Sequence, residues 1–300
     1  MKTVDTAKRN CQRFLYIHSQ NPQPNHPRSD PTMAAKNRWL PKRIILVRHG
    51  ESNDNDDGPS HSTPLSRRGA EQARRAGTRI RDLLDQSCSS WKIYVYVSPY
   101  ECTRSTLREM GRAFPASRLI GVREECRVRE QDFGNFQDPQ KMRQLKEIRN
   151  KFGRFFFRFP EGESGADVFD RVSSFLESMW RDIDMQRFPL DGDDELNLII
   201  VSHGLAIRIF LMRWFRWTVE QFERLKNPKN CEFRVMQLGE GGEYSLAVHH
   251  DEPRLKAWGL SPDMIAEQKL RASTRTHHDF LWYHTFFAPS HDDADTRVTA

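Results

Sequence analysis

Short apolar runs recur along the middle of the chain, and each is followed by a longer amphipathic stretch. The runs are rich in β-branched residues, as buried strands are, and they span 43–47, 93–97 and 196–201. Apolar residues recur at helical spacing in the stretches 66–84, 103–113, 164–183 and 205–217. Strands that alternate with helices predict an α/β domain, because parallel strands need crossover connections and helices usually provide them. We therefore expect a largely parallel sheet.

The two ends of the chain lack this pattern. Residues 1–40 have few apolar side chains and include the proline-rich stretch 21–31, so we expect a disordered N-terminal tail. The low acid content of this tail leaves a transit segment as an alternative. Residues 271–300 are expected to form a solvated C-terminal tail. The folded domain is therefore predicted to span 41–270.

Composition limits the partners and the cellular setting. The chain has 300 residues, a net charge of +6 and an isoelectric point near 9.1, which suit an anionic ligand. Because no Lys/Arg-rich run contains interleaved aromatic residues, no nucleic-acid partner is predicted. The longest apolar stretch, 196–215, is interrupted by His203 and Arg208, so no membrane span or membrane partner is predicted. The oligomeric state stays unknown.

The cysteines indicate a reducing compartment. There are five of them, an odd number, and they are scattered without a CxxC pair. Free thiols in the cytoplasm are therefore expected, with the chloroplast as the alternative location.

Basic and titratable side chains follow all three predicted strands. Arg48 and His49 end the first, Arg104 lies on the first turn after the second, and His203 follows the third. Ligands of open α/β sheets bind beyond the carboxyl ends of the strands, so we expect these groups to converge. Guanidinium groups match phosphate oxygens in charge and shape. The sequence therefore predicts a phosphate pocket.

Other interpretations of these residues are weaker. Any one Arg or His at a strand end is usually a surface group, but three such strand ends in one chain make coincidence improbable. A metal site built on His49 and His203 is disfavoured because the charge of Arg48 opposes a cation. The acidic stretch 54–57 lacks the spacing and the terminal glutamate of a calcium loop.

An ordered set of motifs between Pro41 and Leu270 resembles the histidine phosphatase superfamily, the phosphoglycerate mutase-like proteins. The motifs are LVRHGES, PLSRRGAEQA, SPYECTRSTL, REQDFGNFQ, PEGES and VSHG. Later segments, such as WGLSPDMIAEQK, are most similar to plant phosphoglycerate mutase-like proteins, which implies a plant source. The resemblance implies a three-layer α/β/α sandwich with a mostly parallel central sheet, and a reaction that needs no metal and no cofactor.

The resemblance also implies a role for each matching residue. His49 matches the nucleophile that becomes a phosphohistidine, and Glu130 matches the acid that protonates the leaving oxygen. The residues that match the phosphate clamp are Arg48, Arg104 and His203. The residues expected to bind the substrate beside them are Asn55 and Gly204. The segment 131–163 is expected to form a lid over the leaving group.

Three functions use such a site, and the motifs favour one of them. Cofactor-dependent mutases have an ERHYG-like run where this chain has REQDFG around Glu130, and a tryptophan where it has Asp54. RHGES also lacks their usual glutamine. A phosphatase that acts on a small phosphorylated metabolite is therefore predicted. The alternatives are a phosphoglycerate mutase and a phospholigand-binding regulatory protein with low turnover, although an intact set of site residues disfavours the latter.

Overall fold

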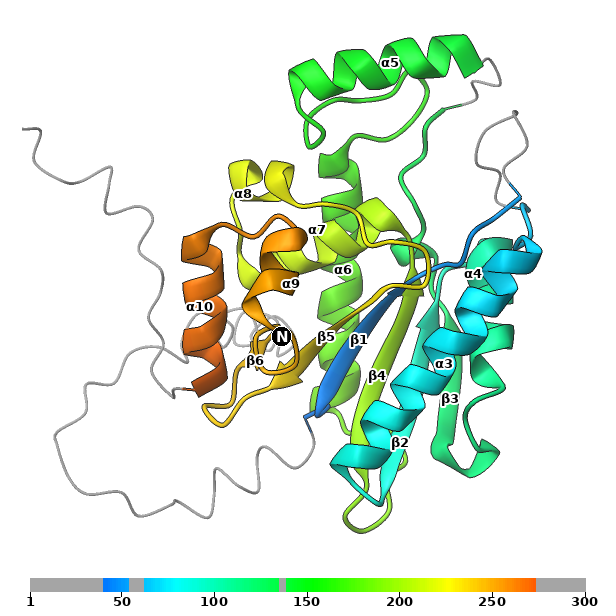
Figure 1. Cartoon of the computed structure of the whole chain (residues 1–300), viewed down its shortest axis with the longest axis vertical. Coiled ribbons are helices and arrows are strands. Elements are labelled where there is room, and N and C mark those ends of the chain that lie inside the picture. Colours follow the sequence, from blue (N-terminus) through cyan, green and yellow to red (C-terminus); the bar gives the residue numbers. More distant parts are fainter. Residues whose placement is uncertain (1–39, 54–61, 135–138, 274–300) are drawn as a thin grey trace, which may run out of the picture. The chain divides into compact units, whose positions relative to one another are not determined.

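A computed structural model describes residues 40–53, 62–134 and 139–273 (Figure 1). These residues contain a six-stranded sheet of order β3-β2-β4-β1-β5-β6. The strands are β1 (Arg43–Arg48), β2 (Trp91–Val97), β3 (Leu119–Glu124), β4 (Glu195–Ser202), β5 (Phe233–Leu238) and β6 (Tyr244–Ser245). The four strands β3, β2, β4 and β1 pair in parallel, and β5 and β6 add antiparallel pairs at one edge. The predicted, mostly parallel sheet is confirmed.

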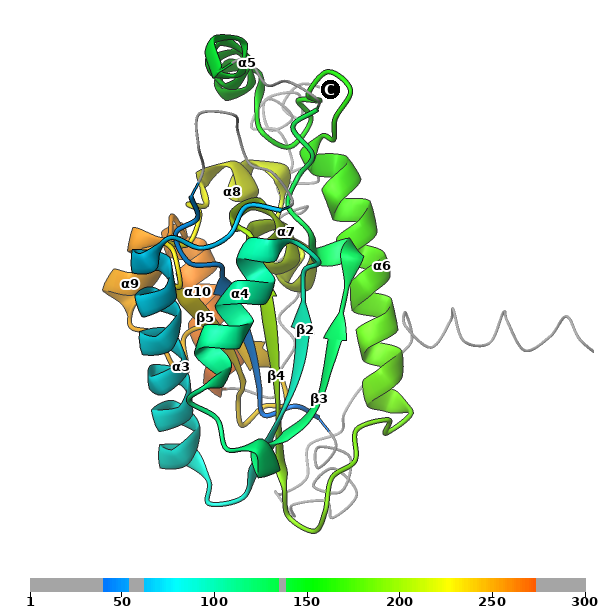
Figure 2. The same cartoon turned by 90° about the vertical axis from the view of Figure 1, so that its right-hand side faces the viewer.

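Helices cover both faces of the sheet (Figures 1 and 2). The helices packed on one face are α3 (Arg67–Ser87) and α4 (Glu101–Gly111), and those on the other are α6 (Gly165–Asp184) and α7 (Gly204–Phe215). The remaining helices are α5 (Pro139–Phe152), α8 (Val219–Arg224), α9 (Glu252–Ala257) and α10 (Pro262–Ser273). The predicted three-layer α/β/α arrangement is therefore confirmed.

The alternation of side chains along β1 explains why both faces need a cover. Successive residues of a strand point to opposite faces, and all of those from Ile44 to Val47 are fully buried. Ile45 packs in one apolar cluster with α3 and α4, whereas Ile44 packs in another with α6 and α7. A strand that is apolar on both faces is stable only between two layers of helices.

The helices on the two faces begin at polar caps. The Ser66 side chain accepts a hydrogen bond from the Gly69 N–H at the start of α3. At the start of α6, Ser164 and Asp167 form the capping box that the sequence predicts, with each side chain accepting from the other residue's N–H. The four predicted helices agree with α3, α4, α6 and α7 to within three residues at each end.

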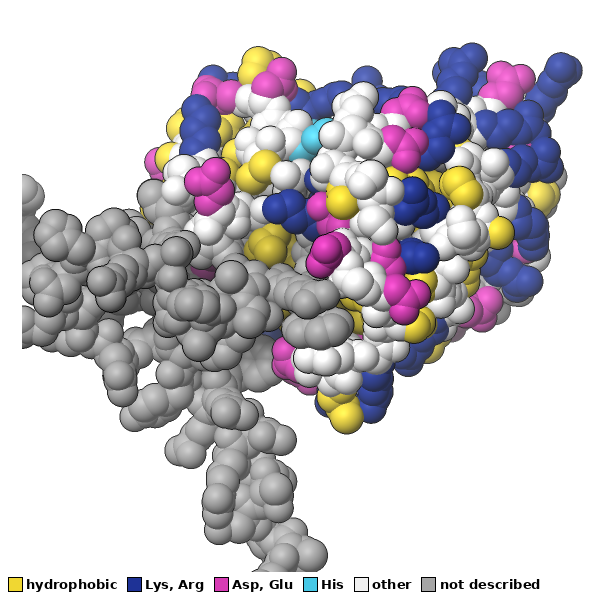
Figure 3. All heavy atoms as spheres, turned by 90° about the horizontal axis from the view of Figure 1, so that it is seen from below, with side chains coloured by type: hydrophobic (Ala, Val, Ile, Leu, Met, Phe, Trp, Pro, Cys, Tyr) yellow, Lys and Arg dark blue, Asp and Glu magenta, His cyan; other side chains and the backbone are white. Residues whose placement is uncertain are grey.

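The structure leaves the two predicted tails almost untested. Residues 1–39 and 274–300 lie outside the described residues, so the tails and the transit segment stay predictions. In the part of the chain that is described, no helix combines the length and the apolar character needed to cross a membrane. On the face seen in Figure 3, Asp and Glu side chains lie among Lys and Arg side chains.

The partly buried His250 makes the stability of the fold depend on pH. The Nε2 atom of His250 accepts a hydrogen bond from the Val235 N–H (2.9 Å), and its ring packs on Trp258. Burial, followed by the charges of His249 and two nearby arginines, lowers the pKa of His250 from 6.5 to about 3. Below pH 6.5 the unfolded chain therefore takes up a proton that the folded protein does not accept until near pH 3. Stability is lost as the pH falls between these values.

We expect His250 to cost about 2 kcal/mol of the free energy of unfolding when the pH is lowered from 7 to 5. Urea unfolding at both pH values measures this difference. The His250→Gln variant keeps an acceptor near the Nε2 position but cannot titrate. Its decrease in the free energy of unfolding between pH 7 and pH 5 should therefore be smaller than that of the unmodified protein by about 2 kcal/mol. An equal loss in both proteins would show that His250 is not held neutral by the fold.

Candidate active site

Two predicted site residues meet where β1 and β4 end. The strands pair in parallel with Arg48 opposite Ser202, and His49 and His203 come directly after these residues. The His49 N–H donates to the Ser202 carbonyl oxygen (3.0 Å), which ties the two strand ends together. The centroids of the His49 and His203 rings are 5.2 Å apart. The convergence expected from parallel strands is present here.

A local hydrogen bond determines which nitrogen of His49 can act as a nucleophile. The Nδ1 atom lies 2.7 Å from the Gly50 carbonyl oxygen, which can only accept. Nδ1 must therefore carry the proton, and Nε2 carries the lone pair. Gly50 itself is required by close packing, because a Cβ at this position would lie 2.6 Å from the Gly69 carbonyl oxygen in α3. The turn after β1 thus orients the His49 ring.

His203 is buried and uncharged at neutral pH. Its Nε2 atom lies 2.7 Å from the Ser98 hydroxyl at the end of β2, and the edge of the Tyr100 ring packs against it. Burial is the main reason that the pKa of His203 lies well below its ordinary value, and the nearby charges of His49, Arg171 and Arg48 lower it further. His203 therefore offers a hydrogen bond to a ligand and not a fixed positive charge.

Arg48 has an unsatisfied donor. Its Nη1 donates to the Pro228 carbonyl oxygen (2.7 Å), whereas its buried Nε has no hydrogen-bond partner among the described residues. The same loop holds the strand end from behind, because the Cys231 N–H lies within hydrogen-bonding distance of the carbonyl oxygens of Arg48 and His49. The Nε atoms of four other arginines in the described part of the chain are buried and unpaired in the same way, so this feature does not by itself mark a ligand site.

Glu130 lies at the start of the helix that follows His203. Its Oε2 accepts from the Leu205 N–H (3.3 Å) in the first turn of α7, and its Oε1 accepts from the Gln131 N–H (3.0 Å). A carboxylate is favoured at a helix N-terminus by the helix dipole. Gly204, the first residue of α7, is buried beside Asn227, whose side chain would lie 2.9 Å from a Cβ at this position. The two predicted residues therefore flank the end of β4.

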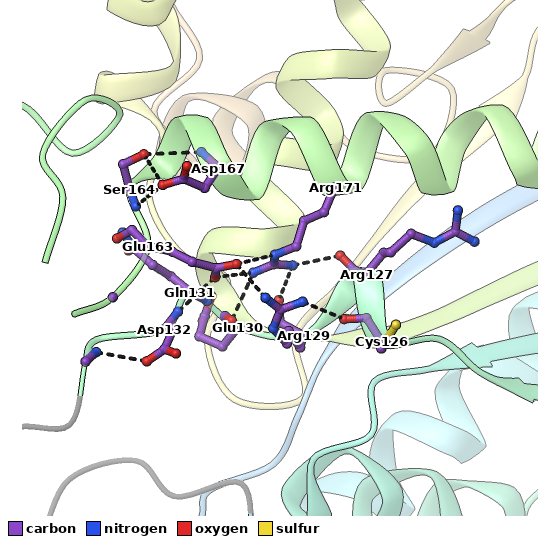
Figure 4. Close-up of polar contacts among 12 residues, drawn as sticks. Cys126, Arg127, Arg129, Glu130, Gln131, Asp132, Glu163, Ser164, Asp167 and Arg171 are labelled. Carbon is purple, nitrogen blue, oxygen red and sulfur yellow. Dashed lines mark hydrogen bonds and ion pairs between the residues drawn. The ribbon is translucent and has the colours of Figure 1, made fainter.

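Arg171 of α6 holds the Glu130 segment in place (Figure 4). Its guanidinium group donates to the carbonyl oxygens of Arg127, Arg129 and Glu130 and forms an ion pair with Glu163. Although burial opposes the charged form, hydrogen bonding to Arg171 helps to hold the pKa of Glu163 below its ordinary value. The sequence gives no signal of this role beyond a charged residue inside an amphipathic helix.

The predicted lid extends beyond the carboxyl ends of the strands (Figures 1 and 2). It contains α5, and its two ends are joined where the Gln131 side chain donates to the Glu163 carbonyl oxygen (2.8 Å). Phe155 and Phe159 anchor the later half in the protein. Residues 135–138 lie outside the described residues. The segment is therefore on the side of the sheet where His49 and His203 lie.

The structure corrects the prediction for Arg104, which is not brought to this centre. Its side chain is 49% exposed and lies 3.9 Å from the carboxylates of Glu101 and Glu124. Two residues correspond to about 200° around a helix, so Arg104 and Cys102 point in nearly opposite directions. Cys102 is buried, and one donor atom from each of His49, Cys102 and His203 lies within 4.8 Å of the others. The Cys102 thiol therefore lies beside the two histidines, where we expected the guanidinium group of Arg104.

The last predicted site residue, Asn55, lies outside the described residues. A cavity of about 600 Å³ is lined by residues of the 226–233 loop and by Arg79, His249 and Arg254. His49, Glu130 and His203 do not line it. The cavity is therefore separate from the centre at the strand ends.

The different positions of the two arginines predict different effects of removing them. We expect Arg48→Ala to lower kcat/KM by about a hundredfold or more, because its guanidinium group can contact developing charge directly. Arg104→Ala should change kcat/KM by about twofold or less, because an exposed and solvated charge contributes little. Steady-state kinetics of both variants on one phosphomonoester measures this contrast. A large loss in a folded Arg104→Ala protein would show that its side chain moves into the site.

Two imidazoles, a guanidinium group and a carboxylate at the strand ends define a centre that can bind an anion and attack it. The chain belongs to the Histidine phosphatase superfamily (branch 1), which it matches over residues 44–251. It is 58% identical over 274 residues to the Arabidopsis thaliana phosphoglycerate mutase-like protein AT74, covering 88% of this chain and 87% of that protein.

Two further comparisons are more distant. The chain is 30% identical to the Saccharomyces cerevisiae broad-range acid phosphatase DET1, covering 67% of this chain and 86% of that protein. Among solved structures, Bacillus stearothermophilus YhfR aligns with a TM-score of 0.52 at 20% identity, covering 70% of this chain and 96% of that one. The resemblance found in the sequence motifs is confirmed.

Proposed function

We propose that this protein is a phosphatase that hydrolyses a phosphomonoester of a small metabolite through a phosphohistidine intermediate. The orientation of His49 carries the proposal, since its Nδ1 proton is held by the Gly50 carbonyl oxygen and its Nε2 lone pair can attack phosphorus. The guanidinium group of Arg48, next to His49 at the end of β1, supports an anionic ligand at the same place. The similarity to a broad-range acid phosphatase agrees with this function.

In the first step, His49 Nε2 forms a bond to phosphorus while the bond from phosphorus to the leaving oxygen breaks. Glu130 acts as the general acid and gives a proton to the leaving oxygen. Arg48 neutralises charge on the phosphoryl oxygens, and neutral His203 adds a hydrogen bond. The products of this step are the free alcohol and phosphorylated His49.

In the second step, water attacks phosphorus and the bond between phosphorus and His49 breaks. The Glu130 carboxylate now removes a proton from the water, which returns Glu130 to its starting state. Orthophosphate leaves and His49 is regenerated. The Leu205 and Gln131 N–H groups hold the carboxylate in one position for both transfers.

Acid-quench labelling with ³²P-labelled phosphomonoesters tests the proposal. The panel includes sugar phosphates, 2- and 3-phosphoglycerate, and an aryl phosphate. Acid-labile protein label together with released orthophosphate is the expected result. Label with interconversion of the two phosphoglycerates would favour a mutase instead, a class also suggested by the name of the Arabidopsis relative. Neither label nor turnover on any substrate would contradict the proposal.

A phospholigand-binding protein with low turnover is a second candidate, and one observation favours it. With Arg104 turned outward, Arg48 is the guanidinium group at the strand ends, and Cys102 lies beside the two imidazoles. Phosphoryl transfer depends mainly on positioning and on neutralising charge at the phosphoryl oxygens. A centre that has a thiol in place of a guanidinium group would bind a phosphorylated ligand but react slowly.

The Cys102→Arg variant tests whether the missing positive charge at residue 102 limits the rate of phosphoryl transfer. We expect it to raise kcat by about tenfold or more, because it adds a fixed positive charge beside the phosphoryl oxygens. Cys102→Met adds bulk without charge and should show no gain. Single-turnover rates of phosphoenzyme formation measure the effect. A folded Cys102→Arg protein with an unchanged rate would show that charge at residue 102 does not limit the reaction.

A further inference from the structure

Three side chains with nitrogen and sulfur donors meet at the end of the sheet. His49 follows β1, Cys102 lies in the first turn of α4, and His203 follows β4, so each comes from a different element. One donor atom from each lies within 4.8 Å of the other two. Cys102 is 6% exposed and His203 is 2% exposed. The phosphatase mechanism uses the two histidines and gives the thiol no role.

The donor set is typical of one class of ligand. Cysteine thiolate and histidine nitrogens bind Zn²⁺ at about 2.3 Å and 2.0–2.1 Å, and a site with three protein ligands leaves a fourth position for an external ligand. Ligand atoms around such an ion are roughly 3–4 Å apart, so the three groups need only small side-chain movements to meet one ion. Hard cations such as Mg²⁺ and Ca²⁺ prefer oxygen ligands, which the trio lacks.

We propose that His49, Cys102 and His203 bind Zn²⁺ and that the bound ion inhibits the enzyme by occupying the nucleophile. The neighbouring charge of Arg48 opposes a cation, but loss of the thiol proton supplies a negative charge in direct contact with the ion. An external anion in the fourth position, such as hydroxide or chloride, offsets the charge that remains. This role rests on the proposed function, in which the same side chains bind orthophosphate, so orthophosphate should compete with the metal.

Cobalt spectroscopy tests the site without any reference to turnover. Co²⁺ added to the full-length protein should give a thiolate-to-cobalt charge-transfer band in the near ultraviolet, saturating at one equivalent. Cys102→Ala should lose this band, and His49→Ala should weaken Co²⁺ binding by about tenfold or more. Cys126→Ala, which changes an exposed cysteine, should keep both band and affinity. The absence of a band, or a band that persists in Cys102→Ala, would overturn the proposal.

Inhibition is measured separately with Zn²⁺. We expect Zn²⁺ to reduce turnover of a phosphomonoester, EDTA to restore it, and orthophosphate to raise the apparent inhibition constant of the metal. EDTA alone should not lower the activity. Activity that is unaffected when the cobalt titration shows the site to be filled would refute the inhibitory role. If no substrate is turned over but the Cys102-dependent band appears, the proposed phosphatase fails while the metal site stands.

Discussion

Replacement of His49 by alanine is expected to abolish turnover and phosphoenzyme formation together. The His49 Nε2 atom is the group oriented to form a bond to phosphorus, and its partner His203 is held by Ser98 and buried. The neighbouring His203 imidazole and Cys102 thiol are both buried, so we expect neither to replace His49, and the loss should exceed a hundredfold, as is usual for nucleophiles.

Rapid-quench labelling and steady-state turnover of the same preparation measure both quantities for His49→Ala. His249→Ala is a matched control, because His249 is an exposed imidazole in the wall of the separate cavity. It should retain both label and activity. A folded His49→Ala protein with more than about a hundredth of the activity would mean that another group attacks phosphorus, or that water attacks directly.

Replacement of Glu130 by glutamine should have an effect that depends on the leaving group. Glutamine can still accept the N–H of Leu205 or Gln131, so the geometry is kept, but it cannot give a proton to the leaving oxygen. Hydrolysis of a sugar or glyceryl phosphate should slow by about a hundredfold or more, because an alkoxide is a poor leaving group. Phosphorylation by p-nitrophenyl phosphate should slow much less, because its phenolate leaves readily as an anion.

The same variant should accumulate phosphohistidine, since the water that hydrolyses it has lost its base. Pre-steady-state kinetics with the two substrates, combined with quantified label, measures both effects. Glu124→Gln serves as the control, because this exposed carboxylate pairs with Arg104 outside the centre. Equal losses on both substrates without trapped label would show that Glu130 is not the acid. Glu125 and Asp132 would be tested next.

Local pattern in the sequence was enough for the central elements of the fold. Apolar runs predicted β1, β2 and β4, because strands buried on both faces contain little else. The edge strand β3 has exposed residues at most positions and was missed, as was β5. β3 pairs with the preceding strand β2 and lacks the apolar pattern that burial would require. β5 is mostly buried, but Arg234 and Gln237 interrupt its apolar run.

The site, too, could be predicted from the sequence only in part. His49 and His203 could be placed together from the sequence, because the carboxyl ends of adjacent parallel strands must lie side by side. Glu130 was found through its motif alone. Its position depends on the hydrogen bond from the Leu205 N–H in α7 and on the hydrogen bond from Arg171 to its carbonyl oxygen. Contacts of that kind join segments that are distant in sequence, so no local pattern encodes them.

The choice between Arg104 and Cys102 was decided by tertiary structure. Both lie in the first turn of α4, and the guanidinium group was the better candidate on chemistry alone. Packing of α4 on the sheet buries Cys102 together with Thr106 and Met110, at intervals of four residues. That face includes residue 102 and leaves Arg104 in solvent, because each residue turns the helix by about 100°. Sequence determined which side chains were available, and the rotation of one helix against the sheet determined which of them faces the histidines.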